Sequence, residues 1–142
     1  MSACLSKGLG APAGTVLLGK PDFIAKAKRA RKILGGGMRQ AGILAAAGLY
    51  ALQHNVARLS EDHRNAARLA AGLRGLALTA EVHTNMVFVR VAPEKLAGLA
   101  EHLRNRAVLA VAGPKMRLVT HLDVDAAGID RALAAFESYF RS

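Results

Sequence analysis

Cysteine and aromatic side chains are scarce in this sequence of 142 residues. The single cysteine, Cys4, has no second thiol with which to form an internal disulfide, and one cysteine with five scattered histidines gives no zinc-ligand spacing. Aromatic residues make up only 4% of the chain and tryptophan is absent, so the stacking platforms that bind single-stranded nucleic acid are hard to build. We expect Cys4 to act as a small buried hydrophobic side chain and no metal to be bound.

Long hydrophobic runs and a secretion signal are also missing. The longest uncharged apolar run, Ala41–Leu52, is shorter than the roughly 20 residues that a transmembrane helix needs. The chain opens with neither a charged segment nor a long apolar segment of the kind that directs secretion. These absences predict a soluble, cytoplasmic protein without a membrane partner.

Acidic residues are few: 10 Asp and Glu stand against 20 Lys and Arg, so the formal net charge is +10. A basic protein of this size suggests nucleic acid as a partner. However, residues 20–39 contain seven basic residues and one acidic residue, which places +6 of the charge in one segment and leaves the rest nearly balanced. With so few aromatic residues, this distribution predicts no nucleic-acid partner. The 52% hydrophobic content predicts a folded core.

The first half of the chain predicts a strand pair and long helices. Residues 3–6 and 15–18 read as short strands, and Pro21 suits the first turn of a helix that runs to about Leu34. The triple glycine at 35–37 stops that helix. A second helical stretch is expected from Met38 to Arg74, with Gly75 as its C-terminal cap.

The pattern changes after residue 75 to alternating strands and helices. Asp123 or Asp125 is expected to cap the last helix, whose apolar residues share one face. The expected order is β-β-α-β-β-α, an α/β layer in which helices cover a sheet. We therefore divide the chain into residues 1–75 and residues 76–142, with strands near 76–80, 85–91, 108–112 and 116–120 and a helix over 93–106.

Lys7 stands at the end of the first expected strand, and the small residues that follow it leave room for a bulky group. The ε-nitrogen of a lysine can condense with an aldehyde to form a Schiff base. The alternative is a surface lysine beside a glycine turn with no chemical role. The residues of this segment alone do not separate the two interpretations.

Five blocks of the sequence, taken together and in order, resemble the low-specificity L-threonine aldolases. This is a pyridoxal-phosphate family of the aspartate aminotransferase fold type, and the resemblance covers essentially the whole chain. The blocks are CLSKGLGAPAG at 4–14, RKILGGGMRQAGILAAAG at 31–48, LSEDHRNA at 59–66, TNMVFV at 84–89 and RLVTHLDV at 117–124.

The resemblance implies a role for four residues. Lys7 would form the internal aldimine with pyridoxal 5'-phosphate, and Arg117 would hold the substrate carboxylate through its guanidinium fork. Lys32 and Arg39 would approach the cofactor phosphate, across a subunit boundary if the site is dimeric; the alternative is a solvated basic helix face. His63 and His121 are candidates for proton transfer, although a structural role is expected for both.

The resemblance also implies the fold and the reaction. Residues 1–75 would form the end of the large cofactor-binding domain, and residues 76–142 a small C-terminal α/β domain. The reaction would cleave L-threonine or L-allo-threonine, a small-molecule substrate, to glycine and acetaldehyde, in a dimer or tetramer. Family members are about twice this length or more.

Several residues that the family carries upstream of its lysine have no counterpart here: a ring-stacking histidine, a ring-nitrogen aspartate, phosphate-binding small residues and a second arginine. The chain is therefore expected to be the C-terminal portion of an aldolase, with an acidic N-terminal half as its complement. The alternative is a catalytically inactive remnant or a partner-dependent subunit. Either version predicts exposed apolar surface and an oligomeric or aggregation-prone chain.

Overall fold

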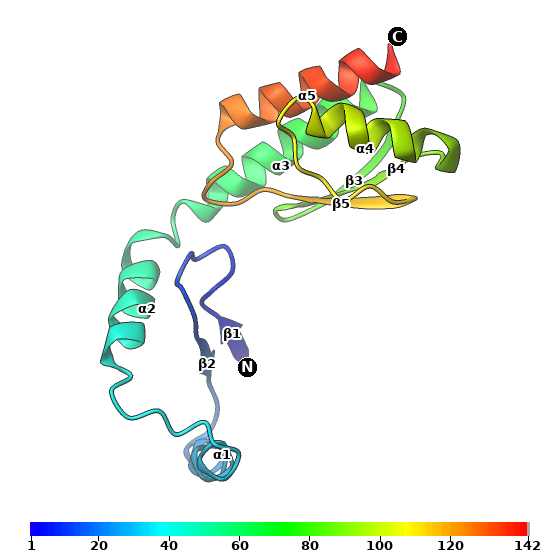
Figure 1. Ribbon diagram of the computed structural model, residues 1–142. Helices are drawn as coiled ribbons and strands as arrows, with labels where there is room; N and C mark the ends of the chain where they lie inside the picture. The colour runs from blue at the N-terminus through cyan, green and yellow to red at the C-terminus, as the bar shows by residue number, and fades with distance from the viewer. Residues whose placement is uncertain (142) are drawn as a thin grey trace. The chain divides into compact units, whose positions relative to one another are not determined.

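The computed structural model describes residues 1–141 and forms two compact units, Met1–Leu59 and Ser60–Ser142 (Figure 1). Both units contain strands and helices, which confirms the α/β class expected from the sequence. No helix among the described residues is both long enough and apolar enough to span a bilayer.

The first unit contains the expected strand pair. Strands β1 (Ser2–Cys4) and β2 (Thr15–Leu17) are antiparallel, with Ala3 opposite Val16. The unit also holds helices α1 (Pro21–Ile33) and α2 (Gly42–His54). Its core is small, because the buried hydrophobic side chains are Leu5, Ala11 and Ala51, with Leu9 packed against them.

The expectation of one helix from Met38 to Arg74 is wrong. The structure has two helices, α2 and α3 (Leu59–Arg74), separated by residues 55–58. The reason is packing: α2 buries Gly48 and Ala51 in the first unit, whereas α3 buries its apolar face in the core of the second unit. Helical periodicity alone does not reveal that two stretches serve different cores.

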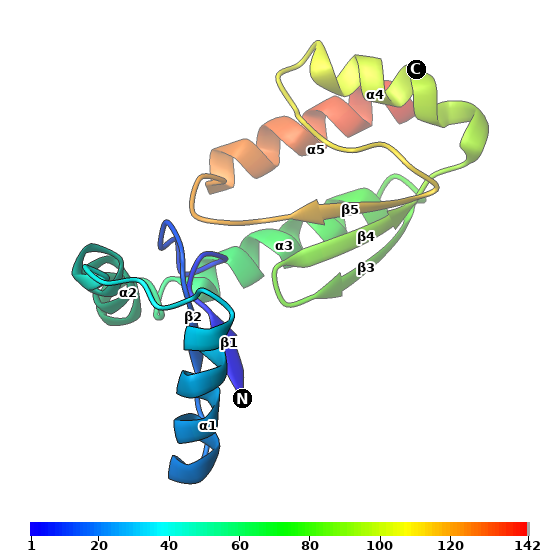
Figure 2. The same cartoon turned by 60° about the horizontal axis from the view of Figure 1, so that its bottom comes forward.

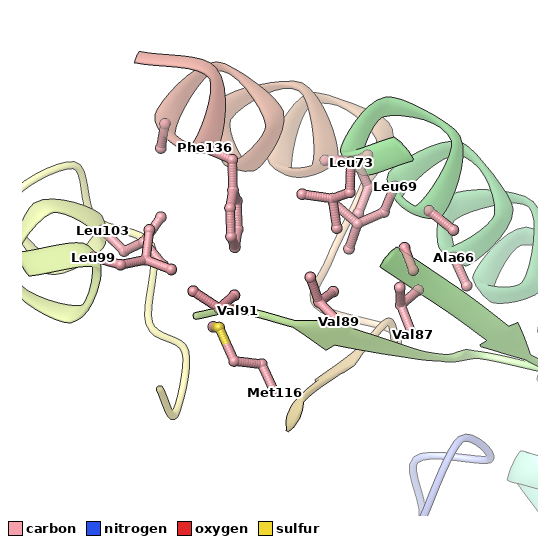
Figure 3. Packing of buried hydrophobic residues seen from close by; sticks show 14 residues of the cluster. Ala66, Leu69, Leu73, Val87, Val89, Val91, Leu99, Leu103, Met116 and Phe136 are labelled. Atoms are coloured by element: carbon pink, nitrogen blue, oxygen red, sulfur yellow. The ribbon is translucent and has the colours of Figure 1, made fainter. Parts of the chain in front are cut away.

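The second unit is a three-stranded antiparallel sheet with helices on one face (Figure 2). The strand order is β3 (Thr79–His83), β4 (Met86–Arg90) and β5 (Lys115–Val119). Helices α3, α4 (Leu96–Arg104, after the 3₁₀ turn η1, Pro93–Lys95) and α5 (Ala126–Phe140) cover it. Their apolar faces and the inward side chains of the strands form one core, which includes Leu69, Leu73, Val87, Val89, Leu99, Leu103, Met116 and Phe136 (Figure 3).

The expected strand at 108–112 is absent, so the order of the second unit is β-β-α-β-α. The backbone N–H of Val108 donates to the carbonyl of Leu103, at 2.9 Å, which ties this segment to the end of α4. Leu109 and Val111 are 88% and 86% exposed. A run of five apolar residues predicts a strand, but no strand among the described residues pairs with this segment.

Two helix boundaries can be compared with their expected caps. Asp125 caps α5, because its carboxylate accepts a hydrogen bond from the N–H of Gly128 at 2.7 Å. The expectation that Gly75 caps the preceding long helix is wrong, since the residue with left-handed backbone is Ala77, with φ of 59°. The two compact units meet at residues 59 and 60, and the division of the chain into domains 1–75 and 76–142 stays a prediction.

Candidate cofactor and substrate site

Lys7 lies on a tight turn between β1 and β2. The N–H of Gly10 donates to the carbonyl of Lys7 at 2.8 Å, which closes the turn. Two further backbone bonds, from Leu5 to Gly14 at 2.9 Å and from Ala11 to Leu5 at 3.0 Å, close the base of the loop. The side chain of Lys7 is exposed, so its ε-nitrogen is accessible on a loop with a fixed backbone.

Helix α2 anchors both flanks of this lysine turn. Leu5 and Ala11 are buried against Ala51, and the side-chain amide of Asn55 donates to the carbonyl of Leu9 at 2.8 Å. Gly48 makes the approach possible, because a Cβ at this position would lie 2.9 Å from a methyl carbon of Leu5. Lys7 therefore lies between Leu5 and Leu9, which are held by contacts with Ala51 and Asn55.

Cys4 and Ser6 lie beside the turn. The Cys4 Sγ is 3.3 Å from the Ser6 Oγ. This side-chain hydrogen bond, helped by one from the Ser6 backbone, lowers the pKa of the Cys4 thiol below its ordinary value. Cys4 is half-buried, so the expectation of a buried hydrophobic residue holds only in part.

Lys32 packs against the triple glycine that follows α1. Gly35 takes a left-handed backbone, with φ of 80°, and turns the chain back over the end of the helix. A Cβ at Gly37 would lie 2.6 Å from the Cδ of Lys32 and 3.0 Å from its Nζ. The glycine therefore leaves room for the lysine amine beside the backbone of the bend.

Lys7, Lys32 and Arg39 all belong to the first unit, and Arg117 belongs to the second. Arg39 follows the glycine bend and is exposed, like Lys7 and Lys32. No acidic partner for any of these cations lies within salt-bridge distance in the described part of the chain. Each is thus available to bind an anion or, in the case of lysine, an aldehyde.

Arg117 projects from the face of the sheet that the helices leave uncovered. Its strand register places it directly opposite Phe88, which in turn faces Glu81 on β3. The residue before it, Met116, points into the core, so alternation along the strand directs Arg117 outward. The arginine also lines a hollow of about 570 Å³ together with His121 and Arg131.

Residues from three of the sequence blocks, 59–66, 84–89 and 117–124, are joined by hydrogen bonds at the end of β5. The hydroxyl of Thr120, which is 1% exposed, donates to the carbonyl of Asp62 at 2.7 Å. The amide side chain of Asn85 donates to the carbonyl of Thr120 at 2.8 Å, and the N–H of Thr120 donates to the carbonyl of Asn85 at 3.0 Å. These bonds fix the end of β5 three residues beyond the arginine.

Sequence reasoning missed the anchoring roles of Asn55, Asn85 and Thr120. The last two stand inside the quoted blocks at 84–89 and 117–124, so the blocks marked the region without showing what their polar residues do. Asn55 lies outside every block. Its partner is 46 residues away, and no local pattern indicates such a pair.

The two histidines lie on the surface of the second unit. His63 is exposed on α3. The Nδ1 of His121 is 3.6 Å from a carboxylate oxygen of Asp123, and it accepts a hydrogen bond from the Asp123 N–H at 3.4 Å. A structural role for each histidine stays a prediction. Among the described residues, no cluster of His, Cys, Asp and Glu is suited to hold a metal ion.

Comparison with known proteins gives consistent matches. Residues 1–94 match the family described as beta-eliminating lyase. The low-specificity L-threonine aldolase of Escherichia coli K12 is 59% identical over 122 residues, which cover 85% of this chain and 37% of that protein. A probable low-specificity L-threonine aldolase of Arabidopsis thaliana is 41% identical over 151 residues, covering all of this chain and 42% of that protein. These matches confirm the resemblance found in the sequence.

Solved structures share the fold at low identity. Serine palmitoyltransferase from Sphingomonas wittichii superposes with a TM-score of 0.77 at 18% identity, over 99% of this chain and 39% of that one. The enzyme from S. paucimobilis, solved with a bound PLP-myriocin aldimine, gives 0.74 at 20% identity, over 99% and 38%. The chain spans about two-fifths of the length of the curated relatives and structures that it matches.

Proposed function

Because this chain belongs to the beta-eliminating lyase family, we propose that it forms the lysine- and arginine-bearing part of a pyridoxal-phosphate-dependent threonine aldolase. The observation that carries the proposal is the anchored turn of Lys7: an accessible amine on a loop that α2 holds at both flanks. The proposed substrates are L-threonine and L-allo-threonine, and the products are glycine and acetaldehyde.

Three exposed cations of the first unit have the chemistry that binds an aldehyde and a phosphate, the two groups of pyridoxal phosphate. Lys7 would hold the cofactor aldehyde through its ε-nitrogen, and the space beside Gly37 leaves the Lys32 amine free to bind the phosphate together with Arg39. When bound, the cofactor supplies a conjugated ring that accepts an electron pair from a bond broken at the substrate Cα. The fixed backbone of the Lys7 turn would fix the point from which the flexible side chain reaches the cofactor.

Arg117 would bind the substrate carboxylate through two parallel hydrogen bonds from its guanidinium group. A fixed carboxylate limits rotation of the substrate and so selects which bond at Cα breaks. In the proposed reaction the Cα–Cβ bond breaks, the hydroxyl oxygen loses its proton and becomes the acetaldehyde carbonyl, and Cα gains a proton to give glycine. The buried bonds of Thr120 would keep the strand end that carries Arg117 in place.

We also propose that residues 1–142 alone do not catalyse the reaction. Asp22 is the only acidic residue of the first unit, and it lies on α1, so the unit that carries the Lys7 turn supplies no further carboxylate to hold a protonated cofactor ring. The absence of any buried residue on α1 likewise favours a subunit that needs further protein surface. The proposed assembly is a homo-oligomer or a complex with the missing portion of the site.

A chimera tests the function directly. We replace the matching segment of the E. coli enzyme with this chain and measure acetaldehyde release from L-threonine. The chimera should turn over, Lys7→Arg should reduce activity to background, and Arg117→Lys should raise KM about 10- to 100-fold because one charged hydrogen bond is lost. Residues 1–142 alone should release none.

The control for this experiment is Arg106→Lys, a matched change on an exposed arginine just beyond α4. It should leave kcat and KM unchanged. A chimera that folds and binds pyridoxal phosphate but keeps its activity with Lys7→Arg contradicts the proposed role of Lys7. Threonine cleavage by the isolated chain contradicts the proposed dependence on further protein surface.

A further inference from the structure

Phe88 is an aromatic residue of the second unit that lies outside the hydrophobic core. Its neighbours on β4, Val87 and Val89, are fully buried, so alternation along the strand directs Phe88 to the face of the sheet that the helices leave uncovered. Phe88 is nevertheless half-buried. The contacts that cover part of its ring therefore belong to this outer face.

Phe88 occupies the centre of the outer face. The register places Glu81 of β3 opposite it on one side and Arg117 of β5 opposite it on the other. The outward positions of the three strands form three rows: Thr79, Arg90 and Lys115; Glu81, Phe88 and Arg117; and His83, Met86 and Val119. The residue proposed to bind the substrate carboxylate is thus the direct cross-strand neighbour of Phe88.

The hydrogen-bond pattern between β4 and β5 brings Phe88 and Arg117 close together. The N–H of Thr120 donates to the carbonyl of Asn85 at 3.0 Å, so these two residues form a hydrogen-bonded pair. Hydrogen-bonded and non-hydrogen-bonded pairs alternate along an antiparallel ladder, and the Phe88–Arg117 pair, three positions further along, is therefore non-hydrogen-bonded. The Cα atoms of such pairs are about 4.5 Å apart, which places their side chains in contact range.

Two further side chains hold the ring of Phe88. The Nζ of Lys115 lies over the ring, 5.0 Å from its centroid, and the ring of His83 meets it edge-on with 6.3 Å between centroids. A guanidinium group also stacks on aromatic faces. Because the ammonium group of Lys115 already occupies a face of this ring, it disfavours stacking of the like-charged Arg117 guanidinium on the same face.

Arg117 has few restraints of its own. The side chain is exposed, and within the part of the chain that the structure describes it forms no salt bridge. A free arginine samples many rotamers, and fixing one of them costs entropy when a carboxylate binds. A bulky neighbour that removes some of these rotamers beforehand lowers that cost.

We propose that Phe88 is a positioning residue for Arg117. Its ring packs along the aliphatic stem of the arginine and limits the directions in which the guanidinium points, while Lys115 on the ring face leaves the guanidinium free to bind a carboxylate. The inference rests on the proposed function, because it requires that Arg117 binds the substrate carboxylate. Phe88 acts through the arginine and does not touch the reacting atoms.

Kinetics of the chimera with L-threonine test this role. Phe88→Ala should raise KM about three- to tenfold and leave kcat within about twofold, because a mobile arginine binds the carboxylate more weakly in ground state and transition state alike. Phe88→Leu keeps an apolar side chain beside the stem and should return KM to within about twofold of the parent chimera. The matched control is Met86→Ala, on the same strand and face but opposite Val119, which should leave KM within about twofold.

Equilibrium binding separates the carboxylate contact from the rest of the ligand. Glycine and 2-aminoethanol both carry an amine, but only glycine carries a carboxylate. In isothermal titration calorimetry on the chimera, Phe88→Ala should weaken glycine binding about three- to tenfold and leave 2-aminoethanol binding within about twofold. In the Arg117→Lys background, Phe88→Ala should change the affinity for glycine by less than about twofold, because the fork that the ring orients is gone.

Three results would overturn the inference. Equal rises in KM with Phe88→Ala and Met86→Ala would mean that the whole face matters and not the pair. Equal weakening of glycine and 2-aminoethanol would place the effect outside the carboxylate contact. A Phe88→Ala chimera that dissociates into smaller species in sedimentation velocity would assign the ring to a contact with further protein surface. An unchanged KM in Arg117→Lys alone would instead contradict the proposed role of the arginine.

Discussion

At the scale of single residues, Thr120 joins segments that are far apart in the sequence. Its hydroxyl is buried and donates to the carbonyl of Asp62, and its backbone exchanges hydrogen bonds with Asn85. Asp62 and Asn85 are 58 and 35 residues distant from Thr120. One threonine therefore ties the start of α3 and the β3–β4 turn to the end of β5.

We predict that Thr120→Val lowers the free energy of unfolding of the second unit by about 1–2 kcal/mol, because it removes a buried donor without changing the side-chain volume. Urea denaturation followed by circular dichroism measures the change. Thr79→Val, at an exposed position of β3, is the control and should change stability by less than about 0.5 kcal/mol. Equal effects of the two substitutions would contradict the role of the buried hydroxyl.

Residue types and spacing predicted little of the site by themselves. Lys7 could be singled out as a lysine before small residues, and only the resemblance of five blocks gave it and Arg117 a chemical role. Asn55 could not be found in this way, because its contribution is one long-range bond to Leu9. The roles of Lys7, Lys32, Arg39 and Arg117 stay predictions until the chimera is measured.

At the scale of elements, helices α1, α3 and α4 end in the same hydrogen-bond motif. In each, one N–H reaches back five residues and the N–H before it reaches back three: Gly36 to Arg31, Leu78 to Leu73 and Val108 to Leu103 are the longer bonds. This is the Schellman motif, which places one residue in left-handed backbone. Helix α1 uses Gly35 there, whereas α3 and α4 use Ala77 and Ala107, with φ of 59° and 57°.

We predict that Ala77→Gly and Ala107→Gly each raise the free energy of unfolding by about 0.5–1 kcal/mol, because glycine adopts the left-handed region without the Cβ penalty. Thermal and urea denaturation measure the gain. Gly35→Ala is the reciprocal control and should destabilise the end of α1. The prediction fails if both alanine-to-glycine variants unfold more easily than the parent chain.

Local signals predicted the elements whose ends depend on nearby residues. Pro21 at the start of α1, the glycines after it and the Asp125 cap all act within a few residues, and the structure confirms them. The unbroken helix from 38 to 74 and the strand at 108–112 were wrong. Both depend on what lies opposite in space: α2 and α3 face different cores, and residues 108–112 have no strand to pair with.

At the scale of the whole molecule, burial is unequal between the two units. Among the described residues, the core of the second unit contains 14 buried hydrophobic residues, and that of the first contains three. Segments with little burial open locally at low free energy. The first unit also carries the segment of charge +6, so its exposed helix is rich in the residues after which trypsin cleaves.

We predict that limited trypsin digestion cuts first within residues 20–39 and then after Arg58, leaving a resistant fragment of the second unit. That unit contains many arginines of its own, so resistance would reflect burial and not a shortage of sites. Mass spectrometry of a time course identifies the fragments. First cuts within α3 or β5 would contradict this order.

Two expectations for the whole molecule stay predictions. A net charge of +10 suggests that the complementary part of an aldolase is acidic. The exposed apolar residues of the first unit, among them Ile33, Ile43 and Leu49, predict self-association of the isolated chain. Sedimentation velocity on purified residues 1–142 measures it.

The absence of a side chain at Gly48 leaves room for Leu5, which closes the base of the turn that carries Lys7. A Cβ at residue 48 would lie 2.9 Å from the Cδ1 of Leu5, and the backbone N–H and carbonyl of Leu5 close the base of the lysine turn. A methyl group added on α2 would therefore push on the side chain of Leu5 at the base of the turn, without altering any charge or hydrogen-bonding group. Position 48 is 41 residues from Lys7 in the sequence, so side-chain volume at a distant position can change the packing beside the lysine turn.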